Sequence, residues 1–248
     1  MARIVAVSLK MYFNRRRTLA YCEEVARVAR DSHGVQDGSV RLAVLPDHLT
    51  LAAAAETIVE SGAMLGAQDL SQEDRGAFTG EVSGADIAAL GASIAEVGHA
   101  ERRTIYREDE TMVAAKTAAA LRNGLIPLLC IGEAERADDP ALAAAVCAAQ
   151  VRSAIRDKGT DGEVWLAYEP YWAIGAPAPA PSAYVRSVCD ALRAELVDLL
   201  PGFSLVYGGS AGPGLLAELY PSVDGLFLGR FAHDPAALAQ VVRDAATL

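Results

Sequence analysis

Short apolar runs recur along the chain, and each is followed by a longer alanine-rich stretch whose apolar positions have helical spacing. Eight such runs are present: Arg3–Val7, Arg41–Leu45, Met64–Ala67, Ser93–Val97, Ile126–Ile131, Val164–Tyr168, Ser204–Tyr207 and Gly225–Leu228. Strands that alternate with helices indicate parallel pairing, because each crossover must return over the sheet. Eight repeats within 248 residues therefore predict a closed (β/α)8 barrel.

The alternative is an open, doubly wound sheet, which normally carries a glycine-rich dinucleotide loop after one strand. No GxGxxG follows any of the eight runs. No linker divides the chain, and the alternating proline stretch Ala176–Pro181 is too short to join two domains, so we assign it to a functional loop. Because α/β barrels of about 250 residues commonly fold as one unit, we expect residues 1–248 to form a single domain.

Charge, apolar runs and cysteine spacing exclude several classes of protein. The chain has 22 Lys and Arg against 32 Asp and Glu, a formal net charge of −10, which argues against nucleic-acid binding. No apolar run approaches the ~18 residues that span a bilayer, and the N-terminus lacks the polarity of a secretory signal. The four cysteines are far apart without a CxxC pair, which favours reduced thiols in a cytoplasmic protein. We therefore expect no membrane association.

Polar residues follow several predicted strands at their carboxyl ends, where the loops of such a barrel converge. Lys10, His99 and Glu169 follow the first, fourth and sixth strands, and glycine-rich turns follow the last two strands: Gly208, Gly209, Ser210, Gly229 and Arg230. Each has an ordinary interpretation by itself: a solvated lysine, a histidine at a helix start, a carboxylate paired with arginine, and turns. That all of them fall at the same face of the predicted barrel is stronger evidence for a functional site than any one residue.

Together these residues suit proton transfer next to a carbonyl group. Glu169, in a dry loop, would remove a carbon-bound proton, and Lys10 would place a positive charge beside the developing oxyanion. A helix dipole would keep His99 neutral, so that it could donate or shuttle a proton. Backbone N–H groups of the glycine turns could bind a phosphate, which predicts a small phosphorylated substrate. This chemistry needs no metal and no organic cofactor, and no ligand cluster is apparent.

Five segments give the chain a resemblance to the triosephosphate isomerase family, whose fold is the TIM barrel. They are AYEPYWAIG at 167–175, VGHAERR at 97–103, CIGE at 130–133, GAFTGEVS at 76–83 and YGGS at 207–210. The resemblance runs nearly from end to end. It implies a sugar-phosphate isomerase that moves a proton between adjacent carbons through an enediolate.

The resemblance also implies residue roles. Glu169 is the base, His99 the electrophile and Lys10 the fixed cation, with Glu101 and Ser8 as supporting residues. By the same resemblance, the phosphate of the substrate is bound by Gly175, Ser210, Gly229 and Arg230. Residues 172–175 are expected to form a lid that closes over the substrate. Family members are homodimers, so the loop Gly76–Ser83 is expected to place Thr79 near the neighbouring subunit's Lys10 and His99. Arg102 and Arg103 are expected to hold loops together or to lie at that interface.

The chain departs from the family pattern at four places. Ser8 stands where the family usually has asparagine, and Gly229-Arg230 replaces Gly-Gly. The lid continues into Ala176-Pro177 instead of Thr-Gly, and Ala100 replaces the serine that usually follows the histidine. A pyrrolidine ring fixes φ and removes a donor, which bears on lid motion in the run Pro177, Pro179 and Pro181.

The first three departures resemble the branch of the family that isomerises L-erythrulose 1-phosphate, since a shorter side chain at Ser8 makes room for one more hydroxymethyl group. The main prediction is thus an isomerase of a four-carbon ketose phosphate. An ordinary triosephosphate isomerase of glycolysis, which interconverts dihydroxyacetone phosphate and D-glyceraldehyde 3-phosphate, is the alternative. A catalytically silent binding protein and a different barrel enzyme with the same phosphate pocket are disfavoured, because Lys10, His99 and Glu169 are all present.

Overall fold

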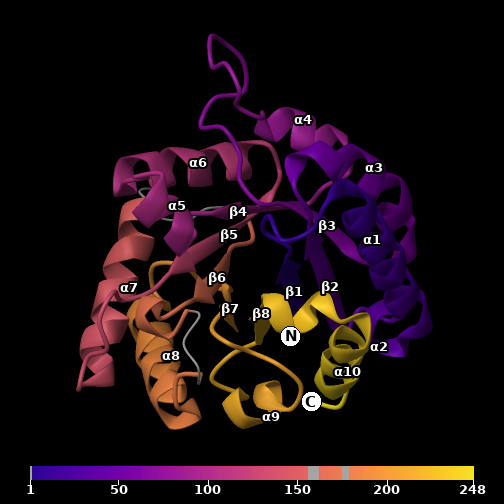
Figure 1. Ribbon diagram of the computed structural model, residues 1–248. Helices are drawn as coiled ribbons and strands as arrows, with labels where there is room; N and C mark the ends of the chain where they lie inside the picture. Colours follow the sequence, from indigo (N-terminus) through magenta and orange to yellow (C-terminus); the bar gives the residue numbers. More distant parts are fainter. Residues whose placement is uncertain (1, 156–161, 175–178) are drawn as a thin grey trace.

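Eight parallel strands close into a barrel in chain order (Figure 1). The computed structural model describes residues 2–155, 162–174 and 179–248. The strands are β1 (Arg3–Ser8), β2 (Val40–Leu45), β3 (Met64–Ala67), β4 (Ile94–Val97), β5 (Ile126–Ile131), β6 (Trp165–Tyr168), β7 (Ser204–Tyr207) and β8 (Gly225–Leu228). The predicted (β/α)8 TIM barrel is confirmed, and each strand end lies within one residue of its predicted place.

Helices surround the barrel (Figure 1). They are α1 (Arg15–Asp31), α2 (His33–Gln36), α3 (His48–Ile58), α4 (Gly84–Ala89), α5 (Ala100–Ile105), α6 (Glu110–Arg122), α7 (Pro140–Ala154), α8 (Ser182–Leu196), α9 (Leu215–Leu219) and α10 (Pro235–Ala246). Short 3-10 turns occupy Val59–Ser61, Tyr171–Ala173 and Arg230–His233. Side-chain caps fix the starts of α1, α3 and α6, where Asn14, Asp47 and Asp109 each accept a hydrogen bond from the first helical turn. No helix in the described part of the chain is long and apolar enough to cross a membrane.

Side chains of each strand alternate between the barrel interior and the helices. On β1, Ile4 and Ala6 belong to the apolar cluster inside the barrel, whereas Val5 and Val7 belong to the larger cluster between barrel and helices. Strand β8 can pair with β1 only because residue 225 is a glycine: a Cβ at this position would lie 1.9 Å from the carbonyl oxygen of Ile4. These two apolar clusters hold the strands in place, and the strand ends in turn set the positions of the loops that follow them.

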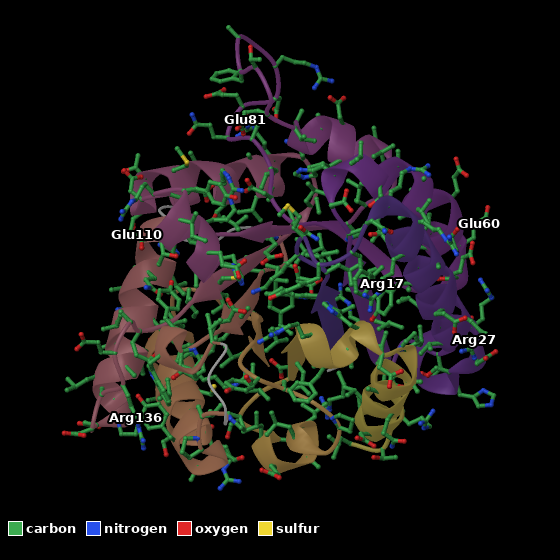
Figure 2. The ribbon with its side chains drawn as sticks, in the orientation of Figure 1. Arg17, Arg27, Glu60, Glu81, Glu110 and Arg136 are labelled. Atoms are coloured by element: carbon green, nitrogen blue, oxygen red, sulfur yellow. The ribbon has the colours of Figure 1, made fainter. Side chains whose placement is uncertain are left out.

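The loop between β3 and α4 extends beyond the ring of helices (Figure 1). Residues 75–81 are all exposed, and Phe78 exposes 41% of its surface. Glu81 lies at the base of this projection (Figure 2). Gly76 and Gly80 adopt φ values of 140° and 91°, which side chains rarely adopt, so the glycines define the shape of the loop.

Candidate active site

The carboxyl ends of the strands surround a cavity of about 770 Å³. Lys10 lies two residues beyond β1, His99 two residues beyond β4, and Glu169 directly after β6; all three line the cavity. The turns that follow β7 and β8 line it as well, with Gly208, Gly209, Ser210, Gly229 and Arg230. The structure therefore brings together the described candidate residues. Gly175 lies outside the described residues, as do Ala176 and Pro177 of the lid.

His99 is the N-cap of α5 and is held as a neutral ring. Its Nδ1 accepts a hydrogen bond from the Glu101 backbone N–H at 3.1 Å, so the ring proton is on Nε2. That Nε2 lies 3.5 Å from Oε2 of Glu169. Burial, and then the charge of Lys10, lower the pKa of His99 to about 4. The ring can therefore donate from Nε2 at neutral pH without carrying a charge.

Glu169 is a buried carboxyl of raised basicity. It is 4% exposed, and burial, followed by the charge of Glu96, raises its pKa to about 8. Its Oε2 has no hydrogen-bond partner among the described residues. A Cβ on Gly208 would lie 2.5 Å from Cγ of Glu169, so the glycine after β7 makes room for this side chain. A carboxylate with an unpartnered oxygen facing the cavity is suited to accept a proton.

Lys10 supplies the positive charge of the cavity. Its Nζ donates to Oε1 of Glu101 at 2.9 Å. Burial disfavours the ammonium form, but the hydrogen bond and charge of Glu101 outweigh it, and the pKa of Lys10 is raised. The residue has a φ of 49°, uncommon for a side-chain-bearing residue, and Gln68 Nε2 donates to its carbonyl oxygen. Local interactions thus hold the ammonium in the site.

Glu96 is a site residue that the sequence analysis missed. It lies on β4 within a run interpreted only as an apolar strand, yet it faces the barrel interior, like Ile94 two residues earlier. Its Oε2 accepts a hydrogen bond from Ser8 Oγ at 2.9 Å. Burial raises the pKa of Glu96 to about 8, against the opposing effects of Ser8 and Lys10. The signal available in the sequence was a charged residue at an inward position of a predicted strand.

The two turns next to Glu169 form the candidate phosphate site. Ser210 is partly buried and follows the buried Gly209, while Gly229 precedes the 3-10 turn Arg230–His233. Arg230 is exposed at the rim, with its guanidinium 5.9 Å from the centroid of the Tyr12 ring. Backbone N–H groups in glycine turns and a guanidinium at the rim form a combination that suits a phosphate. Within the described residues, no group of three His, Cys, Asp or Glu side chains is placed to hold a metal ion.

A carboxyl in the loop after β5 accepts hydrogen bonds from three aromatic side chains. Oε1 of Glu133 accepts from Trp172 Nε1 at 2.8 Å, from Tyr168 Oη at 3.1 Å and from Tyr184 Oη at 3.2 Å. Trp172 is thereby tied through one acceptor in the loop after β5 to Tyr168 on β6 and to Tyr184 on α8. Directional hydrogen bonds as well as packing therefore hold the residues that follow β6.

Arg102 and Arg103 hold loops together. Arg102 contacts Asp69 at 2.9 Å and Glu108 at 2.6 Å, and Arg103 donates to the Gly98 carbonyl oxygen at 2.7 Å. These bonds fix the segment from β4 to α6, which carries His99.

Comparisons with known proteins agree with this geometry. The triosephosphate isomerase family model matches residues 3–245. L-erythrulose-1-phosphate isomerase of Pectobacterium atrosepticum is 46% identical over 250 residues, which cover 98% of this chain and 96% of that protein. Triosephosphate isomerase of Leifsonia xyli is 34% identical, with 97% and 96% covered, and that of Mycobacterium sp. strain JLS is 36% identical, with 93% and 92% covered.

Proposed function

The chain belongs to the triosephosphate isomerase family, and we propose that its substrate is a four-carbon ketose phosphate of the L-erythrulose 1-phosphate type. It is a sugar-phosphate isomerase, as the family assignment and the curated relatives show. The observation that carries the substrate proposal is the 46% identity to an L-erythrulose-1-phosphate isomerase, against 34% and 36% to two triosephosphate isomerases. Ser8 and Gly229-Arg230, the departures from the usual family pattern, support it.

The proposed reaction starts with a proton transfer to Glu169. L-erythrulose 1-phosphate has its carbonyl at C2, between the phosphorylated C1 and the hydroxyl-bearing C3. Glu169 removes the proton from C3, and the electron pair of the broken C–H bond forms the enediolate across C2 and C3. His99 Nε2–H and the Lys10 ammonium stabilise the negative oxygen. The proton on O3 is transferred to O2, through the neutral His99 ring, and Glu169 delivers its proton to C2, so the carbonyl ends at C3, O2 becomes a hydroxyl and no atom is gained or lost.

We propose that the glycine turns hold the phosphate while Glu101 and Ser8 support the reacting groups. Ser210 and Gly229 offer backbone N–H groups, and Arg230 adds a positive charge at the rim. Gly175 belongs to this set by family resemblance. Glu101 fixes Lys10 through the 2.9 Å ion pair and positions His99 through its backbone N–H. Each interaction places a group at the atom where charge develops.

We also propose a cytoplasmic homodimer in which residues 1–248 form one domain. A second hollow of about 380 Å³ lies beside the first and is lined by Lys10, His99 and Glu101 together with residues of neighbouring loops. In the proposed dimer the loop 76–83 of a second copy, which carries Thr79 and is exposed over residues 76–81, covers this hollow. The four cysteines are buried free thiols, which agrees with a reducing compartment.

Parallel kinetics test the substrate. Initial isomerisation rates are measured for L-erythrulose 1-phosphate and for dihydroxyacetone phosphate on the same preparation, with Glu169→Gln as the blank. We expect a higher kcat/KM for the four-carbon substrate. A kcat/KM for the triose near the ceiling of ~10⁸ M⁻¹s⁻¹, with the tetrulose far below it, would instead make this an ordinary glycolytic enzyme. A rate that Glu169→Gln leaves unchanged would contradict the isomerase mechanism altogether.

A further inference from the structure

Ser8 and Glu96 form a polar pair inside an otherwise apolar barrel. The preceding inward positions on the same strands are Ile4 and Ala6 on β1 and Ile94 on β4, all in the interior cluster. Strand β1 pairs with β2 and β8, and β4 pairs with β3 and β5. The 2.9 Å hydrogen bond from Ser8 to Glu96 therefore joins strands that are not neighbours and crosses the barrel interior beneath the catalytic groups.

The pair lies on the side of the reacting groups that faces away from the phosphate turns. Four residues line both hollows: Ser8, Lys10, His99 and Glu101. The first hollow continues to the glycine turns after β7 and β8, and the second continues to Glu96 and Gln68. A substrate whose phosphate is held in the first hollow, with its reacting carbons at His99, thus directs its other end toward Ser8 and Glu96.

The carboxyl of Glu96 has unused hydrogen-bonding capacity. Its Oε2 accepts the bond from Ser8 Oγ, and no other residue in the described part of the chain bonds to this carboxyl. A carboxyl group offers two oxygens and about four lone-pair sites, or a donor proton when neutral, and Ser8 Oγ can accept as well as donate. A hydroxyl group of a ligand could therefore donate to an oxygen of Glu96 or of Ser8. It could also accept the proton that the neutral Glu96 carboxyl donates.

We propose that Ser8 and Glu96 bind the terminal hydroxymethyl group of the four-carbon substrate, and so determine specificity for it. The inference rests on the proposed function and deepens it. When the proton moves between C2 and C3, the C4 hydroxymethyl group is the part of the substrate that extends beyond the reacting carbons, away from the phosphate on C1. A triose phosphate ends at the reacting carbon, so it leaves the pair without a ligand.

The cost of burying this carboxyl supports a functional role. A polar group in an apolar interior is unfavourable unless it finds hydrogen-bond partners, and an apolar side chain such as Ile94 fills the next inward position on β4. A site that is built to bind a hydroxyl group rejects an analogue that lacks it, because the buried polar groups then remain unpaired. Ser8 and Glu96 have this arrangement at the position where the two substrates differ.

Inhibition by unreactive analogues tests the proposal without depending on turnover. The probes are a tetritol phosphate, which keeps the terminal hydroxymethyl group, and glycerol 3-phosphate, which lacks it. For Glu96→Leu and for Ser8→Ala we expect Ki of the tetritol phosphate to rise ~10-fold or more, and Ki of glycerol 3-phosphate to change less than ~2-fold. Any residual activity supplies the assay in which both inhibitors compete.

Asp224→Asn is the matched control. Asp224 is another buried carboxyl, but it precedes β8 at the opposite end of the barrel and accepts hydrogen bonds from Leu205 N and Arg193. We expect it to leave the ratio of the two Ki values unchanged. Should Glu96→Leu fold poorly, Glu96→Gln keeps the shape of the side chain and is expected to change the same ratio in the same direction.

The outcomes separate this proposal from the proposed function. If the native protein isomerises the tetrulose and the variants weaken both inhibitors by the same factor, Ser8 and Glu96 are structural and only this inference falls. If the native protein prefers the triose and binds both analogues equally, the substrate assignment and the inference both fall. A selective loss of tetritol phosphate binding supports the hydroxymethyl site.

Discussion

Glu96→Gln is expected to stabilise the protein increasingly as the pH rises. Burial is the largest cause that raises the pKa of Glu96, from 4.5 to about 8, and Ser8 and Lys10 only partly oppose it. Between these two pH values the folded state holds one more proton than the unfolded state, so the stability of the native protein falls as the pH rises through this window. Below pH 4.5 both states are protonated and the effect vanishes; above pH 8 it is complete.

The magnitude follows from the two pKa values. They differ by about 3.5 units, and each unit corresponds to about 1.4 kcal/mol, so the full penalty is about 5 kcal/mol. At pH 6 about 2 kcal/mol of it is present, and at pH 9 nearly all of it. The variant, which cannot ionise at this position, should therefore gain roughly 3 kcal/mol over the native protein between pH 6 and pH 9.

Urea unfolding of both proteins at pH 6 and pH 9 measures this difference. Protein concentration must be the same throughout, because the stability of an oligomer depends on it. Ser8→Ala is the control: it keeps the ionisable group and removes a hydrogen bond that favours the carboxylate, so its dependence on pH should be at least as steep as that of the native protein. A constant difference between Glu96→Gln and the native protein at the two pH values would refute the argument that burial penalises the charge.

Three further predictions concern the catalytic groups. In ¹⁵N NMR, His99 should remain neutral from pH 5 to pH 9, since burial and Lys10 lower its pKa to about 4; an imidazolium signal at pH 6 would contradict this. Glu169 must be ionised to act as a base and its pKa is raised to about 8, chiefly by burial, so kcat/KM should rise with pH and level off only above pH 8; a flat profile from pH 6 to pH 9 would show that its ionisation does not control the rate. Arg230→Gly should raise KM ~10-fold with little change in kcat, whereas an equal loss in kcat would place Arg230 at the reacting carbons.

Most of the barrel was predictable because its signals are local. Each strand is a short apolar run with a helical pattern after it, and the strands occur where these runs were found. The convergence of Lys10, His99 and Glu169 followed from one rule of topology: the carboxyl ends of parallel strands meet at one face. Glu96 was not predictable by that reasoning, because the run Ser93–Val97 remains mostly apolar around it.

The interactions between these residues could not be obtained from local patterns. The bond from Ser8 to Glu96 joins positions 88 residues apart and depends on which inward side chains face each other across the barrel. The neutral state of His99 was expected from the dipole of a helix. In the structure His99 is the N-cap of α5 and its Nδ1 accepts a hydrogen bond from the Glu101 N–H, so the helix start contributes as expected. Burial and the charge of Lys10, which lower the pKa of His99, depend on the fold and had no local signal.

The two buried glutamates connect stability with chemistry. The lower inward layers, with Ile4, Ile94 and Trp165, stabilise the barrel by excluding water, and the same exclusion continues to the strand ends where Glu96 and Glu169 lie. There it raises the pKa of both carboxyls, and for Glu169 the charge of Glu96 raises it further. The burial that opposes ionisation of both carboxyls thus makes Glu169 a stronger base, and it leaves Glu96 with hydrogen-bonding capacity that the described residues do not use.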